Sequence, residues 1–443
     1  MYPSEPPYTS DSESIKAVGT QGVVPLTSAT SHTAKVSWVR LLWVLLGPGL
    51  IAMIGDNDAG GVISYAATGI AFGFSVFMPL VLMLSPVTYA IQEMSMRLGL
   101  VSQKPFPVLV YSHFGKFWGT FSLFTLLIEN ILTLVTEFIG MSIGLTVLGL
   151  PFVLADAISL IATVGFALFG KYWTKERLAL IVGALNLVFV GIAMVTIHHQ
   201  LSTPSGITWQ WMTGGAHQTM YFILATVGNA VAPWMIFFQG SAVIDKGMTH
   251  RDLHYGRIDT ALGSAVQSVI AFAILLCGAA LYRYGTAHPS VSAVPLAMFH
   301  GFFETYGVYV RDLFALGLIN AGFLAAITIS LSTSWTFAGV FGWAKSLNDR
   351  LWQAPKFYAL YVGGLIVAAL IVLIPHLPLT ALAVATQVIA AILMIPILTF
   401  LTLLTSDTRL MGVYRNRPFA KWRAWSITIV IAAFTLSLFW GGW

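Results

Sequence analysis

The chain reads Gly55-Asp56-Asn57-Asp58-Ala59-Gly60-Gly61 in the middle of a largely apolar stretch that runs from Trp38 to Phe77. If this stretch spans a membrane, each acid costs about 2.5–3.5 kcal/mol on insertion scales and needs a functional reason. Irregular backbone is tolerated at membrane depth only where it is buried in protein or lines a wet cavity. We therefore expect the helix to unwind here, so that the freed carbonyls and the Asp58 carboxylate become ligands for a hard cation. A simple loop between two short helices is the alternative.

The composition places the chain in a membrane. Hydrophobic residues make up 57% of the 443 residues and charged residues only 9%, whereas about a quarter of an ordinary soluble domain is charged. The single cysteine, Cys277, excludes a disulfide framework and is expected to be a small buried hydrophobe. The net charge of +5 does not indicate nucleic-acid binding, because the basic residues lie in short loops between apolar segments.

Apolar segments of about 20 residues, enough to cross a bilayer core of about 30 Å, recur eleven times. They begin near Trp38, Ser75, Gly119, Phe152, Leu178, Met220, Thr260, Leu313, Phe357, Leu379 and Trp422. All Lys and Arg residues except Arg283 and Arg311 then fall on one side, which the positive-inside rule assigns to the cytoplasm. We therefore predict a multi-pass cell-membrane protein with a cytoplasmic N-terminus and an extracellular C-terminus.

The domain organisation follows from the same pattern. Residues 1–38 are rich in Ser, Thr, Pro and Gly and are predicted to be a disordered cytoplasmic tail without a cleavable signal peptide. The transmembrane domain is expected at 39–443, with repeats at about 39–200 and 218–404 and a last helix at about 422–441.

A second interruption falls in the sixth span, where the chain reads Gly228-Asn229-Ala230-Val231-Ala232-Pro233-Trp234. Proline removes a backbone donor and kinks a helix. Breaks at corresponding positions of two halves, here spans one and six, predict an inverted-repeat transporter whose substrate site lies near the membrane midplane. A kink that serves only packing is the alternative explanation of Pro233.

Several ungapped segments resemble the Nramp family of divalent-metal transporters. They are Gly47-Pro48-Gly49 with Asp58 nine positions later, Phe72-Gly73-Phe74-Ser75, Arg97–Val101, Glu137–Gly140 and Thr405–Gly412. The resemblance covers roughly residues 39–440. It implies an all-α polytopic membrane protein of the leucine-transporter type, with two inverted five-helix repeats, an eleventh helix, broken helices 1 and 6, and alternating access.

The chain departs from this family at two expected metal ligands. The family's Asp-Pro-Gly-Asn becomes Asp58-Ala59-Gly60-Gly61, and its Met-Pro-His becomes Ala232-Pro233-Trp234. A soft methionine sulfur favours transition metals, whereas Mg²⁺ prefers oxygen and keeps several waters. These substitutions resemble the Nramp-related magnesium transporter branch. The expected function is therefore import of Mg²⁺, and also of Mn²⁺, by alternating access.

The predicted metal site comprises Asp58, Gly61, Asp56, Asn57, Asn229, Ala232 and Gln387. Gln387 resembles the family's tenth-helix glutamine, and either metal coordination or an interhelical hydrogen bond would explain it. Asn229 matches a position whose backbone carbonyl contacts metal in the family. Glu129 and Glu137 lie in the third span, where structural and functional interpretations are equally open.

Proton coupling is not expected, because the family's protonatable positions hold Trp234, Gln239 and Leu134. One alternative is a proton-coupled Mn²⁺ or Fe²⁺ symporter, for which a register slip could bring the Met235 sulfur to the site. An amino-acid transporter of the same fold is another. The histidines lack zinc-enzyme spacing and no loop could form a soluble domain, so neither an enzyme nor a receptor is expected. The expected partners are divalent cations, as substrate, and lipid, with no nucleic acid, no further cofactor and a monomeric state.

Overall fold

The computed structural model describes residues 47–168, 172–201, 209, 215–288, 295–344 and 351–440. The predicted tail at 1–38 lies outside these residues, and the repeat boundaries stay predictions. Within the described part every regular element is helical, and Phe74 and Trp209 form an isolated β-bridge. The predicted all-α class is confirmed.

The helices of the described part follow one another along the chain. They are α2 (Pro48–Gly55), α3 (Ala59–Phe72), α4 (Phe77–Ser102), α5 (Phe106–Val147), α6 (Phe152–Leu168), α7 (Tyr172–Leu185), α8 (Val188–Leu201), α9 (Ala216–Ala230), α10 (Pro233–Asp245), α11 (Leu253–Ala280), α12 (Tyr282–Ala287), α14 (Pro295–Tyr306), α15 (Val308–Phe341), α16 (Pro355–Val372), α17 (Leu379–Ser406), α18 (Thr408–Met411) and α19 (Pro418–Trp440).

Nine helical segments of the described chain are long and apolar enough to cross a membrane. Two shorter apolar helices, Ala59–Phe72 and Phe152–Phe166, coincide with the first and fourth predicted spans. Each predicted span therefore has a helical counterpart. α5 has a kink at Gly115, whose φ of +87° is non-helical. The third span, predicted to begin near Gly119, corresponds to the part of α5 that follows this kink.

Both predicted breaks are present. The first separates α2 from α3, and the second separates α9 from α10. A third break, which the sequence did not reveal, separates α7 from α8 at Asn186 in the fifth span. The Asn320 side chain donates a hydrogen bond to Asn186 Oδ1 at 2.5 Å, so a polar contact with α15 accompanies this break.

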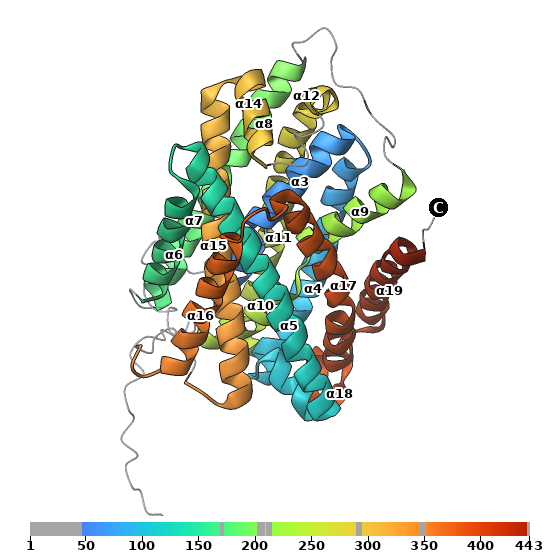
Figure 1. Ribbon diagram of the computed structural model, residues 1–443. Helices are drawn as coiled ribbons and strands as arrows, with labels where there is room; N and C mark the ends of the chain where they lie inside the picture. The colour runs from blue at the N-terminus through green and yellow to red at the C-terminus, as the bar shows by residue number, and fades with distance from the viewer. Residues whose placement is uncertain are drawn as a thin grey trace, which may run out of the picture. The chain divides into compact units, whose positions relative to one another are not determined.

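Helices from both halves of the chain pack around α3, which begins at the first break (Figure 1). α3 packs against α11, α17, α5 and α15, while α17 also packs against α9 and α5. The crossing of α3 and α11 depends on two glycines. A Cβ at Gly69 would lie 2.4 Å from Leu275 O, and one at Gly278 would lie 2.2 Å from Ala66 O. Small residues let membrane helices approach closely, and this crossing holds α3 against the helix that carries Gln267.

Candidate metal-binding site

The first break leaves backbone N–H groups free at the start of α3, and the side chain of Asp58 caps them. Asp56 ends α2, and Asp58 begins α3 in an extended conformation with φ −74° and ψ 171°. Asp58 Oδ1 accepts a hydrogen bond from Gly61 N at 2.5 Å, which is the usual contact of an N-cap with the third helical residue. The local sequence therefore places the Asp58 carboxylate at the N-terminus of α3.

A second carboxylate reaches the same helix end from α5. Glu137 Oε2 accepts a hydrogen bond from Ala59 N at 2.8 Å, and the carboxylate also faces Gly60 N. Backbone N–H groups at a helix N-terminus carry partial positive charge, so both acids are stabilised there. Glu137 thus has a structural role in holding the broken helix, whichever functional role it has in addition.

The second break leaves the last carbonyl of α9 free for other partners. Val231 and Ala232 are extended, and Pro233 starts α10 without needing a backbone donor. The Ala230 carbonyl accepts hydrogen bonds from Thr88 Oγ1 and from Gln267 Nε2, each at 3.0 Å. Side chains of α4 and α11 therefore satisfy the backbone that Pro233 interrupts.

Gln267 on α11 joins the two breaks. Its side-chain nitrogen donates to Asp56 Oδ2 as well as to Ala230 O, and its own backbone carbonyl accepts a hydrogen bond from Asn57 Nδ2 at 3.1 Å. Sequence reasoning missed this residue. The available signal was a glutamine inside the seventh span, where a polar side chain needs a partner.

Two acids also face the N-terminus of α10. The Asp56 carboxylate faces Ala232 N, and the Glu129 carboxylate of α5 faces Trp234 N. Glu129 Oε1 accepts a hydrogen bond from Thr133 Oγ1 at 3.2 Å. Pro233 lies between the two amides and has no N–H. Asp56 Oδ1 and Glu129 Oε2 have no hydrogen-bond partner among the described residues, so this end of α10 leaves both carboxylates with a free oxygen.

Four buried carboxylates, from Asp56, Asp58, Glu129 and Glu137, therefore surround the breaks, and each residue is at most 2% exposed. None of them forms an ion pair with a basic side chain in the described part of the chain. Helix N-termini offset only part of this negative charge. The remaining charge favours a cation.

The oxygen atoms of the site converge where Gly61 lacks a side chain. A Cβ at Gly61 would lie 2.9 Å from Asp58 Oδ1, 3.5 Å from Asn229 Oδ1 and 3.6 Å from the Asp56 carbonyl oxygen. The Asn229 side chain is buried and has no hydrogen-bond partner among the described residues. A carboxylate, an amide oxygen and a backbone carbonyl are the donor types that Mg²⁺, Ca²⁺ and Mn²⁺ accept.

Gln387 on α17 lies on the other side of Asp58. Its Nε2 is 3.5 Å from Asp58 Oδ1, and it is 2.9 Å from the position that a Cβ on Gly60 would occupy. In this orientation the amide nitrogen, not the oxygen, faces the carboxylate. Gln387 thus orients Asp58 here, and metal coordination would need the amide to turn by about 180°.

The structure brings together Asp58, Gly61, Asn229 and Gln387, together with the backbone of Asp56. It places the other two predicted residues differently, because the Asn57 side chain donates a hydrogen bond to the backbone of α11 and only the backbone amide of Ala232 faces Asp56. No group of three or more His, Cys, Asp or Glu side chains in the resolved ranges could hold a metal ion. The candidate site therefore depends on mixed oxygen donors around one carboxylate.

The three positions that hold protonatable side chains in the family are occupied here by Trp234, Gln239 and Leu134, and these side chains make other contacts. Trp234 and Leu134 are buried in the hydrophobic core, as is Met235. The Gln239 side chain donates a hydrogen bond to Thr260 Oγ1 at 2.8 Å. Met235 lies in the first turn of α10, and its side chain is fully buried in the hydrophobic core.

Comparison with known proteins defines the class to which this fold and site belong. The family model "Natural resistance-associated macrophage protein-like" (Nramp) matches residues 49–441. The chain belongs to the Nramp family. This is a family of transporters, so the expectation that the chain is not an enzyme is confirmed.

Individual relatives agree with this assignment. A divalent metal cation transporter MntH from Levilactobacillus brevis is 26% identical over 424 residues, with 90% of this chain and 89% of the relative covered. A protein of the same description from Lacticaseibacillus casei is 24% identical over 422 residues, with the same coverage.

Solved structures confirm the leucine-transporter-type fold. The Eremococcus coleocola manganese transporter has a TM-score of 0.72 at 18% identity, with 94% of this chain and 91% of that chain covered. MhsT in complex with L-phenylalanine has a TM-score of 0.56 at 15% identity, with 89% and 98% covered.

Proposed function

We propose that this chain carries divalent metal cations across the membrane by alternating access, with the ion bound between the two breaks. The observation that supports this most directly is the convergence of Asp58 Oδ1, Asn229 Oδ1 and Asp56 O around the open position at Gly61. The four residues are buried, so a bound ion would be closed off from both sides in this conformation. Alternating access requires such a closed state between the two open ones.

Mn²⁺ is the first substrate to expect, because relatives are described as divalent metal or manganese transporters. The preference for Mg²⁺ that the sequence suggested has no support from these relatives, and the Mn²⁺ alternative is the better founded. Transport of Mg²⁺ in addition remains part of the proposal for a chemical reason. The donors around Gly61 are oxygens, and both ions accept oxygen ligands.

The proton-independent mechanism also stays a prediction. Its support is that Trp234 and Leu134 cannot relay a proton and that Gln239 is bound to Thr260. The proton-coupled alternative has a specific observation in its favour, since Glu129 and Glu137 lie at the two half-helix N-termini and carry no basic partner. If protons accompany the metal, these two carboxylates are the carriers to test.

The topology is proposed as eleven spans with a cytoplasmic N-terminus, an extracellular C-terminus, inverted repeats and a monomeric state. Nine long helices and the two shorter ones at the first and fourth spans support the count. The asymmetric distribution of basic residues supports the orientation.

Uptake by proteoliposomes tests the proposed function. The purified protein should carry Mn²⁺ into vesicles, and Mg²⁺ should compete at millimolar or lower concentration, while protein-free vesicles take up neither ion. Labelled L-phenylalanine serves as the test of the amino-acid alternative. Amino-acid uptake without metal uptake would replace the proposed function with that alternative.

A further inference from the structure

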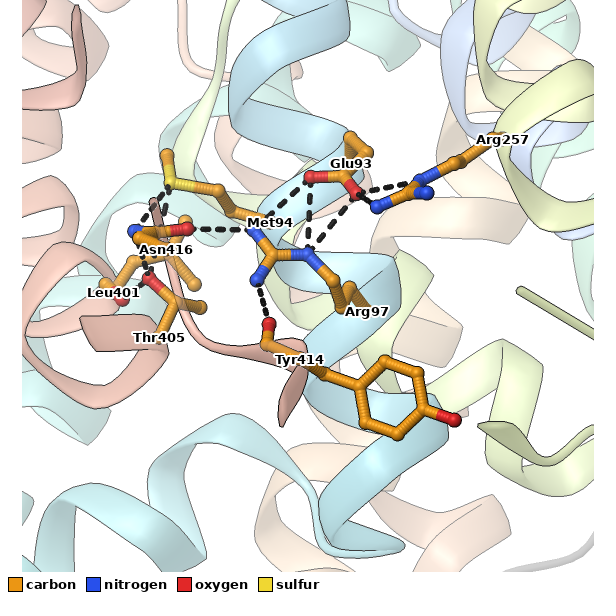
Figure 2. Close-up of polar contacts among 8 residues, drawn as sticks. All are labelled: Glu93, Met94, Arg97, Arg257, Leu401, Thr405, Tyr414 and Asn416. Carbon is orange, nitrogen blue, oxygen red and sulfur yellow. Dashed lines mark hydrogen bonds and ion pairs between the residues drawn. The ribbon is translucent and has the colours of Figure 1, made fainter. Parts of the chain in front are cut away.

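A cluster of charged side chains lies at the C-terminal end of α4, away from the metal site. Figure 2 shows its buried half, in which Arg97 donates to Glu93, to Tyr414 O and to Asn416 Oδ1. The Asn416 side chain in turn donates to Thr405 Oγ1 at 2.8 Å. Arg97 is only 4% exposed, so these contacts occupy its guanidinium within the protein.

Arg257 on α11 reaches the same carboxylate from outside. Its Nε and Nη2 both lie 3.0 Å from Glu93 Oε1. The dashed lines on the right side of Figure 2 mark these two contacts. The Arg257 side chain is 47% exposed, whereas the Glu93 side chain is 9% exposed. One carboxylate is thus shared by Arg97 and Arg257, and the positive charge that it cannot neutralise faces outward on Arg257.

A third arginine adds to this excess. The half-buried Tyr89 side chain on α4 interacts electrostatically with Arg97, Arg257 and Arg423 but with a single acid, Glu93. Arg423 lies near the start of α19, which packs against α4, and it forms no ion pair with any described residue. Among the described residues, three arginines against one glutamate leave an excess of two positive charges around Tyr89.

The surface beside these arginines is apolar. Ile258 follows Arg257 on α11 and is 45% exposed, and Trp422 precedes Arg423 on α19 and is 67% exposed. Exposed apolar and aromatic side chains next to basic ones are typical of the membrane–water interface. Arg257 and Arg423 both lie within the first turns of helices that begin at this end of α4.

We propose that Arg257, Arg423 and Tyr89 bind the phosphate of an anionic phospholipid headgroup between α4, α11 and α19. Guanidinium groups bind phosphate with paired, charge-assisted hydrogen bonds, and the Tyr89 hydroxyl can donate another. Anionic headgroups bind in basic pockets between membrane helices on the cytoplasmic side, which is the side where the topology proposed above places this end of α4. The acyl chains then lie along the apolar surface that carries Ile258. This proposal does not depend on which ion is transported.

Lipid binding to the detergent-solubilised full-length protein tests the proposal. Dissociation constants are measured for short-chain phosphatidylglycerol, short-chain phosphatidylcholine and inorganic phosphate. Phosphatidylglycerol should bind, and both other probes should bind at least about tenfold more weakly. Each of Arg257→Gln and Arg423→Gln should weaken phosphatidylglycerol binding about fivefold, since one basic residue near the surface contributes about 1 kcal/mol.

Arg417→Gln and Arg251→Gln are matched controls, because both arginines are exposed and lie outside the cluster. They should leave the dissociation constant unchanged. Equal weakening in the controls would assign the effect to surface charge, and inorganic phosphate binding as tightly as phosphatidylglycerol would rule out a lipid site. If Arg257→Gln unfolds, Arg423→Gln decides alone, because Arg423 has no described ion pair to lose. Unchanged binding by that variant would overturn the proposal.

Discussion

The Glu137 carboxylate on α5 accepts a hydrogen bond from Ala59 N, the first residue of α3, at 2.8 Å. A carboxylate on α5 thereby holds the N-terminus of α3, which begins at the first break. Because the bond is buried, its loss leaves an amide without a partner, which costs about 1–3 kcal/mol.

The first prediction follows from this bond. Glu137→Ala should lower the free energy of unfolding by about 1–3 kcal/mol, because Ala59 N loses its acceptor inside the protein. Glu137→Gln retains an acceptor oxygen and should lose less. Thermal unfolding of the solubilised protein measures both changes. Glu304→Ala is the control, since Glu304 is exposed and pairs with the exposed His300. Equal stability of Glu137→Ala and the control would show that the cap contributes nothing.

The second prediction concerns the charge of the metal site. Asp58→Ala should reduce metal uptake to the background of empty vesicles while leaving the fold intact, because Asp58 is the carboxylate next to Asn229 and Gly61. Uptake is compared at equal amounts of monodisperse protein. Asp312→Ala is the control, since Asp312 pairs with the adjacent Arg311 away from the breaks. Metal uptake by Asp58→Ala at the parent rate would remove Asp58 from the site.

The third prediction concerns ion selectivity. Ala232→Met adds a soft sulfur at the start of α10, and Gly61→Asn restores the family's amide. Together they should raise the affinity for Mn²⁺ relative to that for Mg²⁺ by about tenfold. Such a change in relative affinity needs only about 1.4 kcal/mol. Calorimetry on the solubilised variants gives this ratio even where transport is lost.

The single variants separate the two contributions. A Cβ at position 61 would lie 2.9 Å from Asp58 Oδ1, so Gly61→Asn requires the carboxylate to move and should weaken binding of both ions. Ala232→Met alone should then show the sulfur effect without this crowding. A folded Ala232→Met protein with the parent's ion preference would show that Ala232 does not determine selectivity.

The fourth prediction concerns protons. Metal uptake should not acidify the vesicle interior, because the family's protonatable positions hold Trp234, Gln239 and Leu134. A pH-sensitive dye inside the vesicles records the result alongside metal uptake. Acidification in fixed proportion to the metal would show coupling instead. Glu129→Gln and Glu137→Gln would then identify the carrier, since only the variant that lacks it should uncouple the two fluxes.

The positions of the two breaks could be predicted from the sequence because their causes are local. Glycines, an N-capping aspartate and a proline each act on the backbone within a few residues, so Asp58 and Pro233 mark helix starts without any tertiary information. The family resemblance rested on the same local segments, and the match over residues 49–441 confirms it.

Only the tertiary structure decided which distant side chains complete the site. Gln267 and Glu137 lie in spans that are apolar on nearly every face, so hydrophobic periodicity does not indicate which way they point. Their roles depend on the rotation of α11 and α5 against the broken helices, which close packing such as the Gly69–Gly278 crossing determines. The break at Asn186 could not be predicted from the local sequence either, because its contact with Asn320 comes from another part of the chain.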